Sequence, residues 1–228
     1  MLYIGLDDTD NLTSRGTGRL ARDIAGVLAA RYTVLGVTRH QLLVDPRVPC
    51  TRKNCSAAIV LDTDDDVEPA AVLEQVSALM LADYQPGSDP GLCVAGNVPD
   101  AVVEFGRRAQ RELLSQAEAR ALAAAHGMRL VGLGGDQGGV IGALAAVGLA
   151  AGGEDGRYVL VGRSRELSGL QPVSALLQAG VGAVRTHSGD PVTEGLVQAD
   201  KLRPARREGQ PVAVVEWGGE CWVPLKLD

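Results

Sequence analysis

The first half of the chain interleaves short apolar runs with stretches whose apolar residues recur at helical spacing. Four short runs predict buried β-strands, at residues 2–6, 33–37, 56–61 and 92–95. Two amphipathic helices are predicted between them, over residues 16–30 and after Pro69, a residue type that a first helical turn accepts. The resulting order, strand–helix–strand–strand–helix–strand, is that of a ferredoxin-like split βαβ arrangement.

A predicted helical pair connects the two halves of the chain. Its first helix covers residues 99–114, and its second runs from a capping box at Ser115 and Glu118 to the vicinity of Gly127. Further strands are predicted at residues 129–131, 158–161, 181–185, 212–217 and 222–227, and helices at 140–151 and 173–178. We therefore predict an α+β fold of two small domains, at least one of them ferredoxin-like. The first would span residues 1–127, including the helical pair as connector, and the second residues 128–228.

Composition supports a folded core and disfavours one class of partner. Hydrophobic residues make up 46% of the chain, which excludes wholesale disorder. The 22 basic and 28 acidic residues give a net charge of −6, which argues against a protein that mainly grips a phosphate backbone. Aromatic residues make up only 3%, so a base-stacking platform is not expected either. Binding of a whole tRNA is therefore disfavoured.

The spacing of the cysteines and the length of the apolar stretches indicate the cellular compartment. Cys50, Cys55, Cys93 and Cys221 form neither a Cys-x-x-Cys pair nor a ring of metal-ligand spacings. The chain starts directly in a strand-like run, and the apolar stretch at residues 140–151 is too short to cross a bilayer. We expect a cytoplasmic protein with reduced thiols and no membrane partner. The oligomeric state stays open, a homo-oligomer included.

The strongest chemical signal is a cluster of acids at the mouth of the first strand. Asp7, Asp8 and Asp10 stand within four residues, and like charges this close are costly unless a cation neutralises them. Oxygen ligands at a strand end suit Mg²⁺, which takes one or two carboxylates together with waters and substrate phosphates. The alternative is a polar turn that caps the next helix.

Two segments beyond these acids could contact phosphate. Small residues around Arg15 and Gly16 precede a helix, where outward backbone N–H groups suit an anion, unless Ser14 or Thr17 simply caps that helix. The proline-stiffened loop at residues 44–54 carries basic and amide side chains that could clamp a triphosphate. The alternative is an ordinary solvated loop. Its candidate ligands are Thr51, Arg52, Lys53 and Asn54.

A glycine-rich segment at residues 132–139 fits no standard phosphate motif. Gly-x-Gly-x-x-Gly fails at Gln137, and the P-loop fails because the chain has no Gly-Lys pair. Because such a segment lacks side chains, Gly138 and Gly139 could still approach a ligand closely. His40 precedes the basic loop and remains a candidate ligand, whereas His187, Ser188 and Asp190 are too close in sequence for a catalytic triad.

Several motifs taken together resemble the archaeal tRNA(Ile) agmatidine synthetase family. They are Gly-Leu-Asp-Asp-Thr-Asp at residues 5–10, Ser-Arg-Gly at 14–16, Asp-Pro-Arg-Val-Pro at 45–49 and Gly-Gly-Val-Ile-Gly-Ala-Leu-Ala-Ala-Val-Gly at 138–148. Members of that family use ATP and Mg²⁺ to phosphorylate the wobble cytidine of an isoleucine tRNA, and agmatine then displaces the phosphate. Their kinase domain carries the Asp-rich motif, and a ferredoxin-like domain carries the Ile-Gly-Ala-Leu-Ala-Ala helix. The resemblance therefore implies a kinase-like ATP/Mg²⁺ domain with a helical connector at residues 1–127 and a ferredoxin-like domain at residues 128–228.

The resemblance implies roles for individual residues. Asp7, Asp8 and Asp10 would organise Mg²⁺ and ATP, with Asp7, Asp8 and Lys53 as the catalytic set. The nucleotide would be contacted by Asp8, Thr9, Arg15, Gly16, Thr51, Arg52, Lys53, Asn54, Gly138 and Gly139. Phosphoryl transfer depends mostly on positioning and charge neutralisation, which such a set can supply.

The chain also departs from the family pattern. Arg19 and Leu20 align with the family's Thr-Thr pair, the site of autophosphorylation, and the family's OB-fold and zinc ribbon have no counterpart before Asp228. We therefore expect an ATP- and Mg²⁺-dependent phosphotransferase or ligase that activates an oxygen of a small-molecule or nucleotide acceptor. The alternatives are a non-catalytic nucleotide-binding regulatory or scaffold protein, and a tRNA-modification subunit that needs a partner to bind RNA.

Overall fold

The computed structural model describes residues 1–63 and 67–227 and confirms the mixed α+β class. The helices are α1 (Thr17–Leu28), α2 (Pro69–Ala82), α3 (Asp100–Ala109), α4 (Gln116–Ala125), α5 (Val140–Gly152), α6 (Val173–Gln178) and the short 3₁₀ turn η1 (Ser164–Glu166). The strands are β1 (Leu2–Asp7), β2 (Thr33–Gln41), β3 (Cys55–Asp62), β4 (Gly91–Ala95), β5 (Arg129–Gly132), β6 (Arg157–Leu160), β7 (Leu170–Pro172), β8 (Ala183–Thr186), β9 (Leu196–Gln198), β10 (Ala205–Arg207), β11 (Gln210–Trp217) and β12 (Trp222–Pro224).

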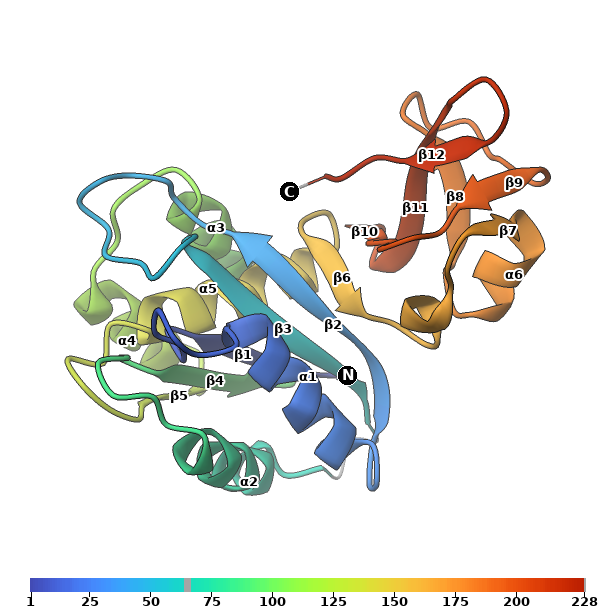
Figure 1. Cartoon of the computed structure of the whole chain (residues 1–228). Helices are drawn as coiled ribbons and strands as arrows, with labels where there is room; N and C mark the ends of the chain where they lie inside the picture. Colours follow the sequence, from blue (N-terminus) through green and yellow to red (C-terminus); the bar gives the residue numbers. More distant parts are fainter. Residues whose placement is uncertain (64–66, 228) are drawn as a thin grey trace.

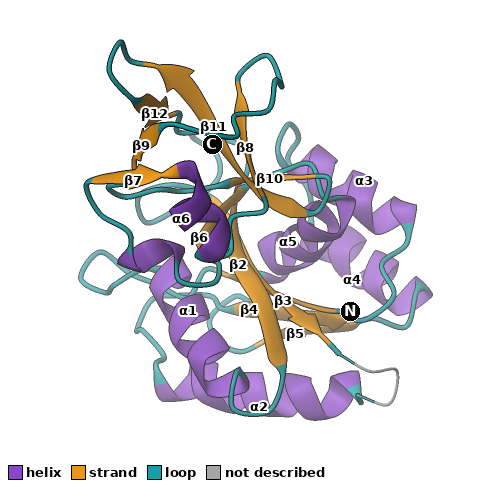
Figure 2. Cartoon of the chain, turned by 90° about the vertical axis from the view of Figure 1, so that its right-hand side faces the viewer, coloured by secondary structure: helices purple, strands orange, loops and turns teal. Residues whose placement is uncertain are grey.

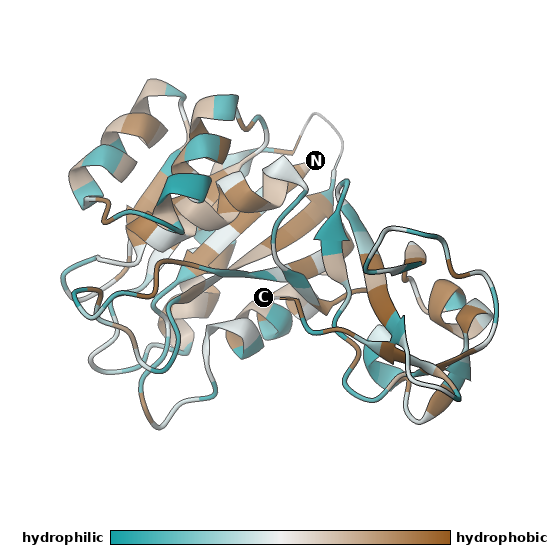
Figure 3. Cartoon of the chain, turned by 90° about the horizontal axis from the view of Figure 1, so that it is seen from above, coloured by the Kyte–Doolittle hydropathy of each residue, from teal (hydrophilic) through white to brown (hydrophobic). Residues whose placement is uncertain are grey.

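The first body of the molecule is an antiparallel sheet with helices on both faces. Its strand order is β5-β4-β1-β3-β2, and the β4-β1-β3-β2 part is that of the split βαβ arrangement predicted from the sequence. Helices α1 and α2 cover one face, while α3, α4 and α5 cover the other (Figures 1 and 2). The central strands carry mostly hydrophobic residues in Figure 3, as expected for a sheet buried on both faces.

Helix α5 lies unusually close to β1 because both carry small residues at the contact. A Cβ atom on Gly5 would lie only 2.0 Å from the carbonyl oxygen of Ala143. On the same helix, Ala146 and Ala150 pack against Ala58 and Val60 of β3. The glycine- and alanine-rich composition of α5 therefore lets a buried helix sit directly on the sheet, with its N-terminus beside the end of β1.

The second body, residues 161–227, is a smaller and mostly β unit with its own core around Leu176, Val184 and Val215. Strand β6 joins the two bodies because it pairs with β2 on one side and with β10 on the other. Arg206 of β10 stabilises this connection between the two bodies. Its buried guanidinium donates to the carbonyl of Ala150 at the end of α5 (Nε–O 2.8 Å) and lies over the ring of Tyr158.

Two expectations need comment at this level. The strand predicted over residues 33–37 continues to Gln41, so His40 lies within β2 and is fully buried. The division at residue 127 stays a prediction. Two elements that follow residue 127 belong to the sheet of the first body: β5 pairs with β4, and α5 packs on the sheet.

Candidate functional site

Three adjoining pockets form one groove at the end of β1. The acidic pocket, about 270 Å³, is lined by Asp7, Asp8, Asp89 and Asp136 among others. It shares Asp7, Asp8, Pro49 and Asn54 with a middle pocket of about 40 Å³. The middle pocket in turn shares Asp10, Thr17, Lys53 and Cys55 with a basic pocket of about 400 Å³. The groove therefore runs from a negative end to a positive end.

Asp7 is held beneath the N-terminal turn of α5. A Cβ atom on Gly142 would lie 1.8 Å from Asp7 Oδ2, so the absence of a side chain at residue 142 makes room for this carboxylate. Burial, together with the charge of the neighbouring Asp8, raises the pKa of Asp7 to about 7. A negative charge at this position is therefore costly unless a cation compensates it.

Asp8 directly follows β1, and its backbone lies in the left-handed region with φ of +51°. Asp and Asn tolerate this conformation better than most residues. Its pKa is raised to about 6, first by burial and then by the charge of Asp89, with smaller effects from Asp10 and Asp136. Two neighbouring carboxyls at the strand end thus titrate well above their ordinary range.

Two further acids, which the sequence analysis missed, complete the acidic pocket. Asp89 precedes β4, and its carboxylate accepts the backbone N–H of Asp136 at 2.8 Å. The start of β4 lies beside the end of β1, since Asp7 and Gly91 are partners in the antiparallel register. That adjacency, implied by the predicted strand order, was the one signal that could have placed Asp89 here.

Gly138 and Gly139 line the acidic pocket, but their close contacts are with the protein itself. The N–H of Gly138 donates to Asp136 Oδ1 (2.7 Å), and that of Gly139 donates to the carbonyl of Asp89 (2.9 Å). A Cβ atom on Gly139 would lie 2.8 Å from the carbonyl oxygen of Asp7. These glycines therefore bring the loop before α5 against the ends of β1 and β4.

The remaining walls of the acidic pocket are largely apolar. They come from the segment after β2, from the connection between α3 and α4, and from α5, and their members are Leu42, Leu43, Val48, Leu113, Leu114 and Ile141. Glu112 and Gln116 add polar groups. Carboxylates opposite apolar walls suit a small organic molecule that carries a cationic group.

The loop over residues 44–54 closes the middle of the groove by packing against the loop after β1. Thr51 Oγ1 donates to the carbonyl of Asp10 (3.2 Å), and Arg52 donates to the carbonyl of Leu12 (3.2 Å). Lys53 lines both the middle and the basic pocket. The basic loop and the acidic cluster, which are distant in sequence, thus meet in the groove.

Helix α1 begins at this groove without a side-chain cap. Its N-cap residue is Gly16, with φ of +87°, and no side chain bonds to the first-turn amides. Ser14, an alternative cap in the sequence analysis, instead accepts the N–H of Asn11 (2.9 Å). Thr17 is buried and accepts the hydroxyl of Thr9 (3.0 Å). Gly16, Thr17 and Gly18, at the uncapped start of the helix, line the basic pocket, which is a place where an anion would be favoured.

Nearly all predicted site residues line the groove. The pocket walls include Asp7, Asp8, Asp10, Arg15, Gly16, Thr51, Arg52, Lys53, Asn54, Gly138 and Gly139. Thr9 is buried behind the wall and bonded to Thr17. Across residues 1–63 and 67–227, no group of three or more His, Cys, Asp or Glu is arranged to hold a metal ion. The roles of these residues, including the metal set Asp7, Asp8 and Asp10, remain predictions.

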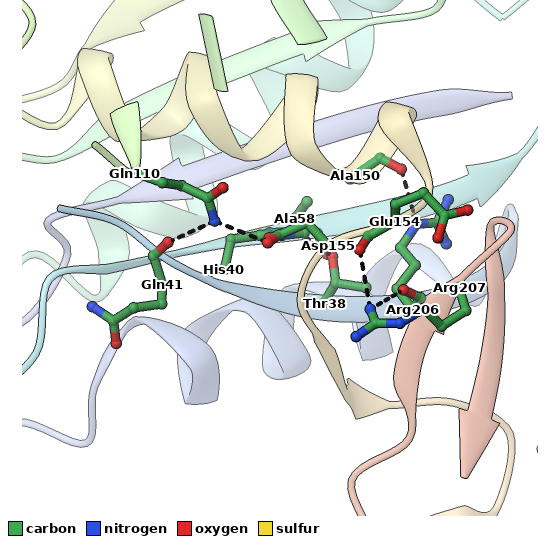
Figure 4. A network of polar contacts seen from close by, with 10 residues as sticks. All are labelled: Thr38, His40, Gln41, Ala58, Gln110, Ala150, Glu154, Asp155, Arg206 and Arg207. Atoms are coloured by element: carbon green, nitrogen blue, oxygen red, sulfur yellow. Dashed lines mark hydrogen bonds and ion pairs between the residues drawn. The ribbon is translucent and has the colours of Figure 1, made fainter. Parts of the chain in front are cut away.

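His40, the other candidate ligand, lies outside the groove in a buried polar network (Figure 4). Its Nδ1 lies 2.7 Å from Asp155 Oδ2 and its Nε2 lies 2.8 Å from Thr38 Oγ1. Gln110, which follows α3, donates to Asp155 Oδ1 (2.9 Å) and to the carbonyl of Gln41 (3.0 Å). The network ties β2 and the end of α3 to the turn before β6, which is a structural role.

Comparisons with known proteins identify the fold. No family model and no curated protein matches the sequence. Among solved structures, apo TiaS, a tRNA agmatidine synthetase, matches with a TM-score of 0.55 and 22% identity over 64% of this chain and 35% of that chain. The complex of TiaS with its tRNA and ATP matches with a TM-score of 0.56, 22% identity and coverages of 64% and 36%. The complex of TiaS with its tRNA, AMPCPP and agmatine matches with a TM-score of 0.54, 20% identity and coverages of 64% and 35%.

The matched region is about a third of the length of TiaS. At this level of identity the likeness concerns the fold of that part alone. In the described part of this chain, no helix combines the length and the apolar character that crossing a membrane requires.

Proposed function

We propose that the protein is an ATP- and Mg²⁺-dependent phosphotransferase or ligase, which activates an oxygen of a small-molecule or nucleotide acceptor. The observation that carries the proposal is the groove of opposite charges at the end of β1, where acids and cations from separate loops line adjoining pockets. The likeness of fold supports it, because the TiaS structures were obtained with ATP, AMPCPP and agmatine.

The triphosphate would occupy the middle pocket and extend toward the basic one. Lys53 lines both pockets, Arg52 lines the basic one, and the uncapped start of α1 at Gly16 adds backbone donors. Positively charged side chains and helix N-termini are the usual partners of phosphate oxygens. In this arrangement the chain's own groups hold the phosphates in place while the acceptor approaches from the acidic side.

The acids fit a magnesium ion that arrives with the nucleotide. Mg²⁺ in nucleotide sites takes only one or two carboxylates and fills its shell with waters and phosphates, so a three-ligand protein cage is not required. Asp7 and Asp8 supply two adjacent carboxyls whose charge is costly in the protein alone. The ion, when bound, neutralises the charge that develops on the transferred phosphoryl group.

The acidic pocket would hold the second substrate. Its volume of about 270 Å³ suits a small molecule, and its carboxylates face apolar walls. Asp89 and Asp136 would attract a cationic group, and Leu113 and Ile141 would contact an aliphatic stem. An amine fits this description and could serve as the nucleophile that displaces an activated oxygen. Its neutral form must be generated for attack, and the neighbouring carboxylates could accept the proton.

The test is calorimetric titration of ATP with Mg²⁺ into the wild-type protein and into Asp8→Asn. We expect Mg²⁺-dependent binding that weakens at least about 100-fold in the variant, because the variant loses a charged ligand to the metal–nucleotide complex. Asn accepts the positive φ at residue 8, so the fold should survive. Asp100→Asn is the matched control, because Asp100 is the exposed first residue of α3 and lines none of the three pockets. Equal affinity of Asp8→Asn and the wild type would overturn the assignment.

A second candidate, a nucleotide-binding regulatory or scaffold protein, is favoured by one observation. At the positions that align with the phosphorylated threonine pair of the resembled family, Arg19 is ion-paired with Asp23 (3.0 Å) and Leu20 is buried in the core. Neither offers a hydroxyl. Steady ATP consumption with an amine and a candidate acceptor would support the enzyme, whereas tight binding without turnover for any acceptor would support the scaffold.

A further inference from the structure

Five arginines gather where α1 of the first body faces the second body. We call them the arginine junction: Arg22, Arg39, Arg157, Arg165 and Arg203. They come from α1, β2, β6, η1 and the connection between β9 and β10, so the two bodies must be docked for them to meet. None of the five belongs to the residues assigned above to ATP.

Strand pairing alone places two of them side by side. Arg39 of β2 and Arg157 of β6 are direct partners in the antiparallel register, an arrangement that is destabilising for like charges. Arg39 also lines the basic pocket of about 400 Å³ together with Arg22. Arg22 and Arg39 therefore connect the junction to the basic end of the groove, on the side away from the acidic pocket.

The other members lie within electrostatic reach of these two. The pKa of Arg22 is lowered by partial burial and by the charge of Arg165, and only the smallest effect, that of Asp23, opposes this shift. The pKa of Arg203 is lowered by partial burial and by Arg165, Arg22 and Arg157. Unlike a carboxyl, a guanidinium cannot relieve such repulsion by changing its protonation state at physiological pH.

Four of the five arginines have no carboxylate partner among the described residues, and Arg39 donates instead to Cys55 Sγ (2.9 Å). In the described part of the chain, no carboxylate forms an ion pair with Arg22, Arg39, Arg165 or Arg203. Arg22, Arg165 and Arg203 each donate to a backbone carbonyl, of Gly18, Val159 and Leu202 respectively. A guanidinium has five N–H donors, so most of their donors stay open to a ligand.

We propose that the arginine junction binds a phosphate group of a ligand other than the nucleoside triphosphate. Several guanidinium groups gathered at one place, two of them in the wall of the basic pocket, match the geometry and charge of a phosphate group. The bound phosphate would supply counter-charge to Arg22, Arg39, Arg165 and Arg203 and bridge the two bodies. The inference does not depend on the proposed function, since it uses neither the acids of β1 nor Lys53.

Inorganic phosphate is the first probe, and the melting temperature in phosphate is compared with that in chloride at equal ionic strength. The test variant is Arg165→Ala with Arg203→Ala, and the matched control is Arg163→Ala, an exposed arginine beside η1. We expect phosphate to stabilise the wild type and the control and to lose most of that effect in the double variant. A double variant that keeps the full effect would refute the site.

Two additional measurements separate the junction from the triphosphate site and from a folding defect. Lys53→Met should keep its response to phosphate, because Lys53 is outside the junction; loss of the response there, with retention in the double variant, would place the anion in the triphosphate site instead. In chloride the double variant should melt no lower than the wild type, because it relieves repulsion. A large drop in chloride would contradict the repulsion on which the inference rests.

Two ligands then identify the source of the phosphate, in the presence of a saturating non-hydrolysable ATP analogue. Ribose 5-phosphate, compared with ribose, represents a small phosphate ester. A single-stranded oligo(dT) of about eight nucleotides represents a phosphodiester chain, whose binding should weaken steeply with salt. Either ligand supports the site if its binding is at least about 10-fold weaker in the double variant. No binding of either ligand or of phosphate to the wild type would overturn it.

Discussion

The two ends of the groove handle like charge in opposite ways. At the acidic end, Asp7 and Asp8 are partly or fully withdrawn from water, and their pKa values rise to about 7 and about 6. Protonation can therefore remove the charge when no cation is present. At the arginine junction, the groups stay charged at any physiological pH. The acidic end can thus lose part of its charge by binding protons, whereas the basic end can be neutralised only by an external anion.

The ends also differ in what builds them. The acidic end lies within the first body, where glycines let the loop before α5 and the ends of β1 and β4 approach closely. The basic end is assembled from both bodies through β6. Damage to local packing should therefore affect the acidic end first, and damage to the docking of the two bodies should affect the basic end first.

The largest effect should come from filling the space beside Asp7. Gly142→Ala places a Cβ atom 1.8 Å from Asp7 Oδ2, so the carboxylate or α5 must move. We expect the free energy of unfolding in urea to fall by about 3 kcal/mol. Gly26→Ala is the control, because nothing lies within 4 Å of a Cβ at this position in α1, and it should gain about 0.5–1 kcal/mol. Equal effects of the two substitutions would mean that the contact at Asp7 is not tight.

A smaller effect concerns the titration of Asp7 in the metal-free protein. Its folded-state pKa is raised, so its stabilising contribution is complete below about pH 4 and is lost as the pH rises through about 7. The stability advantage of Asp7→Asn over the wild type should therefore grow by about 2 kcal/mol between pH 5 and pH 8, a value reduced for partial exposure to water. Urea unfolding in a chelator at both pH values measures it.

A constant difference between the two proteins at pH 5 and pH 8 would contradict the raised pKa of Asp7. The control is Asp45→Asn, because Asp45 is bound by Arg47 and its pKa is lowered to about 2. Its titration lies below both pH values, so the difference between Asp45→Asn and the wild type should not change between them. The comparison thus isolates the buried acid from the general effect of removing a charge.

Sequence reasoning was most successful where the signal is local. The apolar runs predicted strands β1 to β4 and their split βαβ arrangement, although β5 was assigned to the second domain. The acids at residues 7–10 were placed correctly at the end of β1. The acids of the groove at the end of β1 could therefore be predicted from the sequence, whereas their roles remain predictions.

What the sequence concealed depends on long-range contacts. Asp89 and Asp136 stand alone in their loops and join Asp7 and Asp8 only through the pairing of β4 with β1 and the packing of α5. The arginine junction depends on β6 pairing with β2, which no periodicity reveals. His40 was a candidate ligand because the end of β2 was predicted too early, and a strand that is longer by a few residues buries it.

The smallest predicted effect separates the middle of the groove from its two ends. Lys53→Met should weaken ATP binding about 10-fold, or about 1.4 kcal/mol, because a lysine acts on phosphate as a point charge and Arg52 and the start of α1 remain. Lys226→Met is the control, an exposed lysine that lines none of the three pockets, and it should leave the affinity unchanged. Calorimetric titration of ATP with Mg²⁺ measures both. Equal affinities of Lys53→Met and the wild type would move the triphosphate out of the middle pocket and toward the arginines of the basic end. The triphosphate and the second phosphate would then share one anion site at that end.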